Sequence, residues 1–362
     1  MESITQVLAE GAVSAGHDVS VVCFTRGRSA SGTLQGVRVQ RAAQLWESAS
    51  QPLSWAYVRM AWRAATGAHL VHLHAPNMVG AFVATFLPRR VMLLVHWHSD
   101  IVGKGLLGAL VRPLERALLR RADSVVATSP PYATASPLLR DLAAKLSVVP
   151  LGIPEPLTPT ADESARDFAP FLGDRKLVLG LGRLVPYKGF AVLIEAAATL
   201  PDDCVVVIGG AGPLSAELHT QVQKLGLQGR VLLAGRLGEV ELERLFHRAS
   251  VFCLPSVERS EAFGVVLLEA MARMVPCVAT RIEGSGTAWV NEEGVSGLNV
   301  APGDAQALAA ALARVCGDDE LRARLAHGAR RRWEQQFTAA GFVRAFDETY
   351  RSLATTTTAE VR

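Results

Sequence analysis

Short runs of valine, isoleucine and leucine alternate with helix-like stretches along most of the chain. The runs predicted as strands span residues 18–24, 69–74, 90–97 and 124–129 in the first half, and residues 176–182, 204–210, 230–235, 251–255 and 276–280 in the second. Strands that alternate with helices form parallel sheets that carry helices on both faces. The pattern therefore predicts an α/β protein with doubly wound sheets.

A proline-rich stretch divides these elements into two sets. Prolines at positions 150, 154, 156 and 159 are too many for a helix or a strand, so we place a domain linker within residues 146–170. A chain of 362 residues is long enough for two domains, which we predict over residues 1–155 and 156–337. We expect residues 338–362 to form an amphipathic helix that packs back on the first domain, with a fraying tail at Thr355–Thr358.

Composition narrows the class of protein. With 49% apolar and 20% charged residues, the chain is too apolar to be disordered. Its five cysteines are far apart and form no C-x-x-C pair, which favours reduced thiols and a cytoplasmic protein over a disulfide framework. The apolar runs are far shorter than the ~20 residues that cross a bilayer, and the N-terminus lacks a signal-peptide layout. We therefore expect no membrane-spanning segment and no export.

Charge is distributed unevenly between the two halves. Residues 1–160 carry a net charge of +6, whereas residues 161–362 carry −3. Much of the excess lies in a leucine-rich segment with helical spacing, residues 103–121, which holds Lys104, Arg112, Arg116, Arg120 and Arg121. One interpretation is peripheral contact with the anionic inner face of a membrane. The other is an ordinary amphipathic helix with one solvated side, and neither interpretation calls for a nucleic-acid partner.

Candidate chemistry follows the predicted strands, because parallel sheets bind ligands at the carboxyl ends of their strands. In GLGRLVPYKGF, residues 180–190, Gly182 permits close approach of the backbone, while Arg183 and Lys188 flank a strand-to-helix turn. Two cations in this position suit a diphosphate. The stretch is neither a dinucleotide fingerprint, because Val185 replaces the third glycine, nor a P-loop. The alternative is a surface loop with two solvated cations.

A second glycine-rich turn follows the strand at residues 204–210. In GGAGPL, the amides near Gly210 and Gly212 could line a phosphate or ribose pocket. A plain tight turn would explain these glycines equally well.

Two glutamates stand seven residues apart in SEAFGVVLLEAMA, residues 260–272. Glu261 follows a predicted strand, Phe263 and Gly264 begin a helix with free N–H groups, and Glu269 lies about two turns further on. A buried carboxylate needs hydrogen-bond donors, which the hydroxyls of a sugar or ribose supply. The alternative, a solvated Glu261 and a surface Glu269, fits poorly with the apolar residues around the second glutamate.

Together these motifs resemble the retaining nucleotide-sugar glycosyltransferases of family GT4. The resemblance rests on the E-x7-E frame, on GRLVPYKG, on the G-x-G-P element at residues 210–213 and on G-x-S-G-L-x-V-x-P-G-D at residues 294–304. It implies the GT-B fold, in which two Rossmann-like domains, one for the acceptor and one for the nucleotide sugar, face each other across a cleft.

The resemblance also implies a role for each matching residue. Arg183 and Lys188 would hold the donor diphosphate, Glu269 the ribose hydroxyls, and Leu237 would lie against the nucleobase. Glu261 and the amides of Phe263, Gly264 and Val265 would hold the transferred sugar, and Gly182, Gly210 and Gly212 would line the donor site. In the first half, HLHAPN and HWHSDIV look like a subset that builds bacterial lipopolysaccharide and exopolysaccharide, often from mannose-type donors. His98 matches the cleft histidine of the family, and we assign it to orienting the sugar.

The sequence departs from the family at its beginning. Members normally open with a strand and a glycine-rich loop, whereas this chain begins at Met1-Glu2, and Glu2 would match the glutamate of that loop. Either the start codon is assigned too late, or the first strand is lost and leaves a gap in the sheet. The apolar spacing of Ile4, Val7, Leu8, Ala12 and Val13 predicts an ordinary first helix after that position.

Two H-x-H pairs, His72 with His74 and His96 with His98, raise the question of a metal. On a strand, each pair projects from one face and could bind an ion. No carboxylate or cysteine cluster accompanies them, and the Asp-x-Asp element of metal-dependent transferases is absent. We therefore expect no metal and no cofactor.

The resulting functional prediction is a metal-independent, retaining hexosyltransferase. It would use a GDP- or UDP-sugar, mannose-like by resemblance, and a glycan or lipid-linked acceptor. Charge that develops on the departing diphosphate would be met by Arg183, Lys188 and helix N-termini. The alternatives are a sugar-nucleotide epimerase or phosphorylase, a non-catalytic nucleotide-sugar-binding protein, and a nicotinamide-dependent oxidoreductase.

Overall fold

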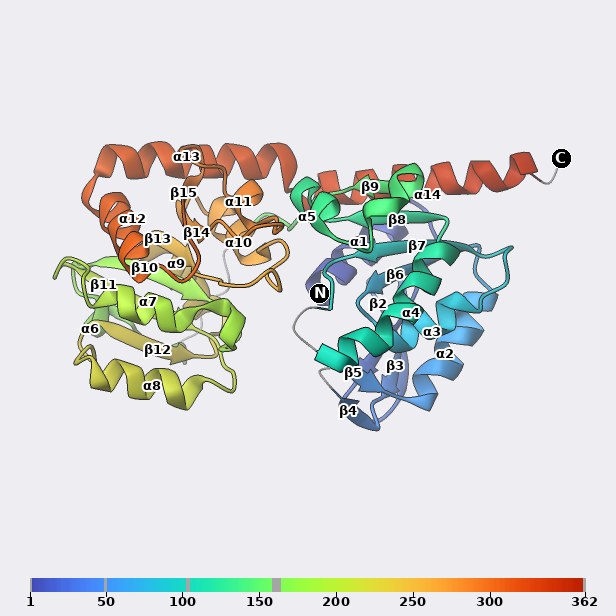
Figure 1. Cartoon of the computed structure of the whole chain (residues 1–362), viewed down its shortest axis with the longest axis horizontal. Helices are drawn as coiled ribbons and strands as arrows, with labels where there is room; N and C mark the ends of the chain where they lie inside the picture. The colour runs from blue at the N-terminus through green and yellow to red at the C-terminus, as the bar shows by residue number, and fades with distance from the viewer. Residues whose placement is uncertain (1, 49–50, 102–104, 158–163, 361–362) are drawn as a thin grey trace. The chain divides into compact units, whose positions relative to one another are not determined.

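The computed structural model describes residues 2–48, 51–101, 105–157 and 164–360 (Figure 1). The chain forms two compact units. The N-terminal unit runs to Pro154 and also contains the chain from Ala339 onward, and the second unit spans Glu155–Thr338. All the runs that the sequence pattern predicts as strands form strands.

The N-terminal unit carries helices around short sheets. Its helices are α1 (Glu2–Ser14), α2 (Trp55–Thr66), α3 (Met78–Thr85), α4 (Gly105–Arg121), α5 (Pro130–Ala135), the 3₁₀ turn η1 (Arg140–Lys145) and α14 (Ala339–Glu360). Its strands are β1 (Ser20–Thr25), β2 (Ala30–Leu34), β3 (Val37–Ala43), β4 (Trp46–Ser48), β5 (Gln51–Leu53), β6 (Leu70–Ala75), β7 (Met92–Trp97), β8 (Ser124–Ala127) and β9 (Leu146–Val148). The predicted first helix is α1, which buries Ile4, Leu8, Ala9 and Ala12.

The parallel strands of this unit lie in two separate sheets. Strands β6, β7, β8 and β9 pair in parallel in that order, and β1 pairs in parallel with β3, which also pairs with β2 in antiparallel fashion. Within the described residues no ladder joins β1 to β6. Strand β2 escapes sequence prediction because all its residues are exposed and carry no apolar alternation.

The sheet from β6 to β9 has two different faces. Leu73 points toward α3, where a Cβ on Gly80 would lie 2.7 Å from its Cδ1 atom. His72 and its strand neighbours on the opposite face meet α14, whose Phe346 stacks on the His72 ring at a centroid distance of 5.0 Å. Period-2 alternation along β6 therefore places apolar side chains on one face and histidines on the other.

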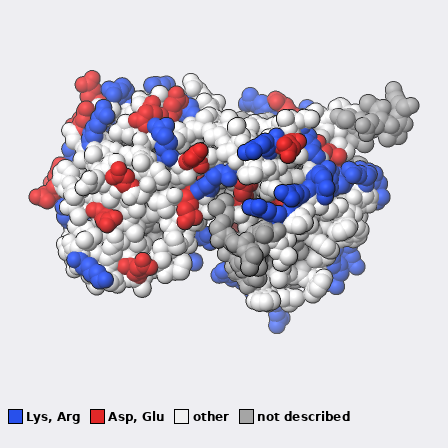
Figure 2. All heavy atoms as spheres, viewed as in Figure 1, with Lys and Arg blue, Asp and Glu red and all other residues white. Residues whose placement is uncertain are grey.

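Basic side chains gather on the N-terminal unit around α4 (Figure 2). On α4, Arg112, Arg116 and Arg120 are exposed, whereas Lys104 lies outside the described residues. Arg121 does not belong to this surface, because its guanidinium is buried and donates to the carbonyl oxygens of Leu87, Pro88 and Val91. The prediction that included Arg121 among the surface cations was wrong for that residue.

The second unit is built around one parallel sheet. Its strands are β10 (Lys176–Leu181), β11 (Cys204–Gly209), β12 (Val231–Gly235), β13 (Ala249–Leu254), β14 (Cys277–Thr280) and β15 (Gly297–Val300), in the spatial order β12-β11-β10-β13-β14-β15. Its helices are α6 (Ala169–Leu172), η2 (Pro186–Lys188), α7 (Phe190–Ala197), α8 (Ser215–Lys224), α9 (Glu239–Arg248), α10 (Val265–Ala272), α11 (Thr287–Val290), α12 (Ala305–Gly317) and α13 (Asp319–Gln336). Both faces of the central strands are buried, so this unit has the doubly wound architecture that the sequence predicts.

The ends of two elements fall in the predicted linker. Strand β9 and the first two residues of helix α6 lie within residues 146–170, so the irregular part of the linker is shorter than predicted. Helix α14 extends through Thr355–Thr358, and the expected fraying of this tail stays a prediction. No glycine or proline interrupts this stretch, and the Thr355 hydroxyl donates to the Ser352 carbonyl at 2.9 Å, so the modest helix propensity of threonine does not end the helix.

Candidate active site

The strand order of the second unit fixes where a ligand can bind. The chain builds outward from β10 through β11 to β12, then returns to place β13 on the other side of β10. Between β10 and β13 the connections therefore leave toward opposite sides of the sheet. The carboxyl ends of two such strands form the crevice in which open α/β sheets hold their ligands. The loops that follow β10 and β13 therefore border this crevice.

Lys188 is positioned by a close contact between the two loops. It ends the 3₁₀ turn η2, and Gly189 follows with φ of +68°, in the left-handed region that favours glycine. A Cβ on Gly189 would lie 2.0 Å from the Pro255 carbonyl oxygen, which belongs to the loop after β13. The Val257 amide also donates to the Tyr187 carbonyl at 2.8 Å. Glycine at 189 is thus what allows the lysine loop to dock on the β13 loop.

This docking brings Lys188 and Glu261 together as a buried ion pair. The Lys188 Nζ atom lies 2.5 Å from Glu261 Oε2, and each residue is only 8% exposed. The Ser256 hydroxyl donates to the same carboxylate oxygen at 3.0 Å. The predicted cation and the predicted first glutamate therefore meet at the switch point of the sheet. An ammonium group has three N–H donors, so Lys188 can bind an anion while it keeps its bond to Glu261.

Hydroxyl side chains that the sequence analysis did not single out hold the Glu261 loop. Ser285 donates to the Glu261 carbonyl oxygen, and Thr280 donates to the Ser256 carbonyl oxygen. Thr287 in turn donates to the Thr280 carbonyl at 3.0 Å. These side chains are buried, and their bonds fix the loop that carries the carboxylate. A serine or threonine is too common in loops for its position alone to have predicted this role.

The N-terminus of α10 presents free backbone donors next to Glu261. Gly264 caps the helix with φ of +83°, and the amides of Phe263, Gly264 and Val265 have no hydrogen-bond partner in the described part of the chain. The Phe263 ring itself is buried and packs edge-on against Phe337, so only its amide can serve a ligand. Free amides at a helix start favour negative charge or a hydroxyl oxygen.

Glu269, the second glutamate of the frame, is half-buried, and its carboxyl group has no hydrogen bond or ion pair among the described residues. It lies on α10, two turns from Glu261, and Arg273 donates to its backbone carbonyl rather than to its side chain. Burial raises the pKa of the Glu269 carboxyl above its ordinary value, although Arg273 acts in the opposite direction. A group in this position gains from any ligand that supplies hydroxyl donors.

Arg183 differs from Lys188 in its surroundings. It is exposed and forms no ion pair or hydrogen bond through its side chain within the described residues. The loop that holds it packs closely on the glycine-rich turn after β11. A Cβ on Gly210 would lie 1.8 Å from the Gly182 carbonyl oxygen, and one on Gly212 would lie 2.3 Å from the Leu184 carbonyl oxygen. These glycines therefore have a structural role in joining the two loops, besides any contact with a ligand.

Leu237 and His98 complete the set of predicted site residues. Leu237 follows β12 and is half-buried, and a Cβ on Gly209 would lie 2.4 Å from its Cδ1 atom. His98 lies in the N-terminal unit, just after β7, where its Nε2 atom is 2.9 Å from His74 Nδ1. Burial and the neighbouring His74 keep the pKa of His98 well below its ordinary value, so its imidazole is neutral at pH 7. All the predicted site residues except His98 therefore belong to the second unit.

The later glycine motif, residues 294–304, has a packing role. A Cβ on Gly297 would lie 1.8 Å from the Cys277 carbonyl oxygen, the Ser296 hydroxyl donates to Asn291 Oδ1 at 3.0 Å, and Asp304 caps α12. This motif secures β15 and starts α12. It supplies none of the groups described above.

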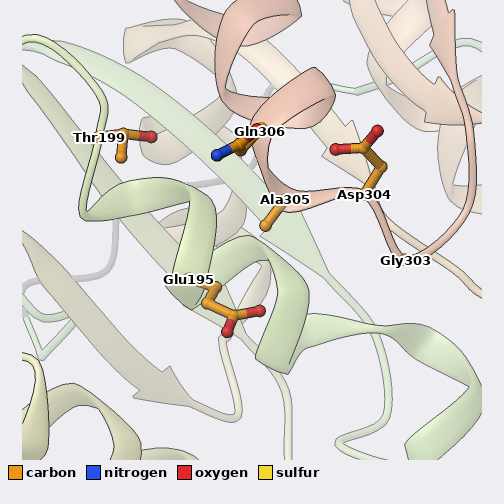
Figure 3. Close-up of a pocket in the computed structure, with 6 residues that line it drawn as sticks. All are labelled: Glu195, Thr199, Gly303, Asp304, Ala305 and Gln306. Atoms are coloured by element: carbon orange, nitrogen blue, oxygen red, sulfur yellow. The ribbon is translucent and has the colours of Figure 1, made fainter.

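A shallow pocket of about 540 Å³ lies elsewhere in the second unit, between α7 and the start of α12 (Figure 3). It is lined by Glu195, Thr199, Gly303, Asp304, Ala305 and Gln306. Carboxylates of Glu195 and Asp304 border it, no cation lines it, and it contains none of the predicted site residues. The buried ion pair at the switch point is a better candidate for nucleotide-sugar chemistry.

Comparison with known families and proteins shows which family the chain resembles along its length. The family described as "Glycosyl transferases group 1" matches residues 162–332, and the family described as "Glycosyl transferase 4-like domain" matches residues 1–152. The chain is 30% identical to the O-antigen chain mannosyltransferase C of Escherichia coli, over 98% of this chain and 94% of that protein. It is 31% identical to the D-rhamnosyltransferase WbpZ of Pseudomonas aeruginosa, over 83% of this chain and 78% of that protein.

Solved structures share the fold. The sucrose-phosphate synthase of Thermosynechococcus elongatus superposes with a TM-score of 0.79 at 23% identity, over 97% of this chain and 93% of that one. Anabaena HepE in complex with UDP and glucose superposes with a TM-score of 0.76 at 23% identity, over 96% of each chain.

Proposed function

The chain belongs to the group 1 glycosyltransferases, and we propose that it transfers a mannose-type sugar, with retention, from a nucleoside diphosphate to a glycan or lipid-linked acceptor of a bacterial cell-surface polysaccharide. The donor is a GDP- or UDP-sugar. The relatives named as an O-antigen mannosyltransferase and a D-rhamnosyltransferase support the sugar class and the product. The solved complexes of HepE with UDP and with UDP-glucose support a sugar nucleotide as the donor class.

The observation that carries this proposal is the buried pair of Lys188 and Glu261 at the switch point of the second sheet. Removing two opposite charges from water is costly, and groups that bond to the pair offset this cost. Here the pair lies beside the free amides at the start of α10 and on the same helix–loop segment as the unpaired Glu269. This arrangement offers cationic, amide and carboxylate groups to one ligand.

In the proposed reaction, the bond between the sugar and the diphosphate breaks while the acceptor oxygen forms a new bond to the same carbon. Lys188 and Arg183 stabilise the negative charge that develops on the departing diphosphate. Glu261 orients Lys188 and, together with the amides of Gly264 and Val265, binds the sugar hydroxyls. The acceptor proton passes to a phosphate oxygen of the leaving group, on the face from which that group departs. No step requires a covalent intermediate on the protein.

Donor binding and transfer can be tested separately. A thermal-shift screen of GDP- and UDP-sugars should raise the unfolding temperature with the correct donor, because a ligand that binds the native state stabilises it. Transfer to a lipid-linked acceptor is then followed by mass spectrometry, and the anomeric configuration of the product by NMR. The Lys188→Ala variant should lose transfer, whereas Lys224→Ala, an exposed lysine at the end of α8, should keep it. Absence of a shift with every sugar nucleotide would refute the donor assignment, and an inverted product would refute retention.

The proposed location is the cytoplasmic face of the inner membrane, where a lipid-linked acceptor would be met. No described helix has the length and apolar character needed to cross a bilayer, so contact would be peripheral. Exposed Trp55 on α2, Phe86 after α3 and Leu110 on α4 accompany the exposed arginines of α4, and α3 packs against both α2 and α4. Aromatic and basic side chains together suit an anionic lipid surface.

A further inference from the structure

Four histidines gather on one face of the N-terminal sheet, beneath α14. This histidine cluster consists of His72 and His74 on β6, His96 on β7, and His98 just beyond β7. Strands β6 and β7 pair in parallel register, with His74 directly opposite His96. Alternation along each strand then places all four imidazoles on the same face.

His96 and His98 are buried, His72 and His74 are half-buried, and the cluster contains buried ring nitrogens without a hydrogen-bond partner. His96 is fully buried, and neither of its ring nitrogens has a hydrogen-bond partner among the described residues. His72 donates to or accepts from the Tyr350 hydroxyl through Nδ1 at 2.7 Å, but its Nε2 atom is buried and unpaired as well. Buried polar atoms are nearly always paired, so three such nitrogens in one place call for a ligand.

Stacked aromatic rings explain the burial but not the unpaired nitrogens. Phe346 of α14 lies 5.0 Å from the His72 ring and 4.9 Å from the His96 ring, measured between centroids. An apolar residue in place of His96 would fill this space without leaving two polar atoms unsatisfied. The choice of histidine therefore indicates a bound species that uses the ring nitrogens.

We propose that the histidine cluster binds one divalent transition-metal ion of the zinc class, through one ring nitrogen each of His72, His74 and His96. These three nitrogens lie within 4.8 Å of one another. Ligand nitrogens around tetrahedral zinc, with bonds of about 2.0–2.1 Å, are about 3.4 Å apart, so side-chain rotation must bring them closer by up to about 1.4 Å. Three imidazoles form a known zinc ligand set, with the fourth position left for water.

The sequence analysis expected no metal because no carboxylate or cysteine accompanies the H-x-H pairs. Two such pairs make a metal site conceivable, and the pairing of β6 with β7 supplies the register that the sequence alone does not give.

The outer shell of this site reaches His98. A metal on the Nε2 atom of His74 leaves its proton on Nδ1, which then donates to His98 Nε2 and sets the tautomer of His98. The metal site itself lies within the N-terminal unit and includes none of the groups proposed to hold the diphosphate. The inference is thus independent of the proposed metal-independent transfer, and it stands even if the donor assignment fails.

The test is metal binding by the full chain prepared without a histidine tag. Competition with a chromogenic chelator should give one equivalent of Zn²⁺ bound with micromolar or tighter affinity. The variants His72→Phe and His96→Phe keep an aromatic ring in the cluster and should weaken binding at least 100-fold. His69→Ala removes an exposed histidine just before β6 and should bind zinc as the wild type does.

A second measurement needs no variant. X-ray absorption of the zinc-loaded wild type should show three imidazole ligands, and Co²⁺ should give the visible bands of a four- or five-coordinate site. Failure of the untagged wild type to bind Zn²⁺ at 100 μM, a spectrum with fewer than two imidazoles, or unchanged affinity in folded His96→Phe would overturn the proposal. Equal loss in His69→Ala would do so too, because it would place the ion on surface histidines.

Discussion

Replacing Lys188 by methionine separates what the buried ion pair does for folding from what it does for transfer. Methionine keeps most of the side-chain volume but removes the charge, and it leaves the Glu261 carboxylate at 8% exposure with Ser256 as its remaining donor. The companion variant Glu261→Gln keeps an acceptor for Ser256, and the double variant removes both charges. Together the three variants form a double-mutant cycle around the 2.5 Å contact.

The expected magnitudes follow from burial. Removal of one partner from a buried ion pair typically costs about 3–5 kcal/mol, because the other charge is left uncompensated. Lys188→Met should therefore lower the free energy of unfolding of the second unit by about that amount. The double variant should recover most of this loss, since an uncharged buried pair is often as stable as an ionic one. Transfer should fall at least ~100-fold in Lys188→Met and stay equally low in the double variant, because neither offers a cation to the diphosphate.

Two assays read these outcomes. Urea unfolding followed by fluorescence gives the free energy of unfolding, and initial rates of sugar transfer give kcat and kcat/KM for each variant. Recovery of stability without recovery of activity supports the assignment. Our reasoning would be refuted if Lys188→Met kept wild-type turnover, or if transfer returned in the double variant together with its stability. The first result would remove Lys188 from the reaction, and the second would make its role purely structural.

Three further variants test the remaining groups of the site and the proposed surface. Arg183→Ala should lower the rate of transfer about 100-fold. It should change the free energy of unfolding by less than about 0.5 kcal/mol, because the side chain is exposed and has no partner among the described residues. Initial rates and urea unfolding measure the two effects. Glu269→Gln should raise the KM for the donor by roughly 10- to 100-fold through lost charged hydrogen bonds. Because burial raises the pKa of Glu269, the folded protein binds more protons than the unfolded chain, so this carboxyl destabilises the fold as pH rises above its unfolded pKa. Glu269→Gln should therefore gain more stability over the wild type at pH 7 than at pH 4 in urea unfolding, and the opposite order would contradict the burial argument. Wild-type protein should sediment with anionic vesicles but not with zwitterionic vesicles. The double variant Arg112→Glu/Arg116→Glu and high salt should each weaken this binding. Equal sedimentation with both kinds of vesicle would argue against a charged contact.

The sequence predicted the second unit well because local and tertiary signals agree there. Each strand of its sheet except β15 stands out as a short apolar run bounded by glycine or proline, and buried parallel strands have no other pattern. Strand β2 of the first unit carries only exposed residues, and tertiary pairing with β3 rather than composition makes it a strand. The threonine stretch of α14 has a similarly weak signal, since its helix propensity is low and the preceding helix extends it.

The candidate site was predictable in its residue types but not in its pairings. Spacing alone suggested that Glu261 and Lys188 serve a ligand, yet they are 73 residues apart, and only the strand order places their loops together. Gly189 illustrates why the sequence alone does not show that the Lys188 loop and the Glu261 loop come together. In the sequence, the glycine after a lysine can be a turn, a helix cap or a ligand contact, and the choice depends on the Pro255 carbonyl that occupies the position of its missing Cβ.

The same limit explains why the histidine pairs were judged unlikely to hold a metal. On either strand alone, an H-x-H pair offers two ligands, which is too few for a stable site. The third ligand comes from register, because a shift of one residue between β6 and β7 would turn His96 to the face that packs against α3. Register between parallel strands is set by packing across the whole sheet, including the contact of Phe346 with both rings. A short motif therefore cannot decide whether these histidines bind an ion, and the zinc titration of His96→Phe tests the register and the site together.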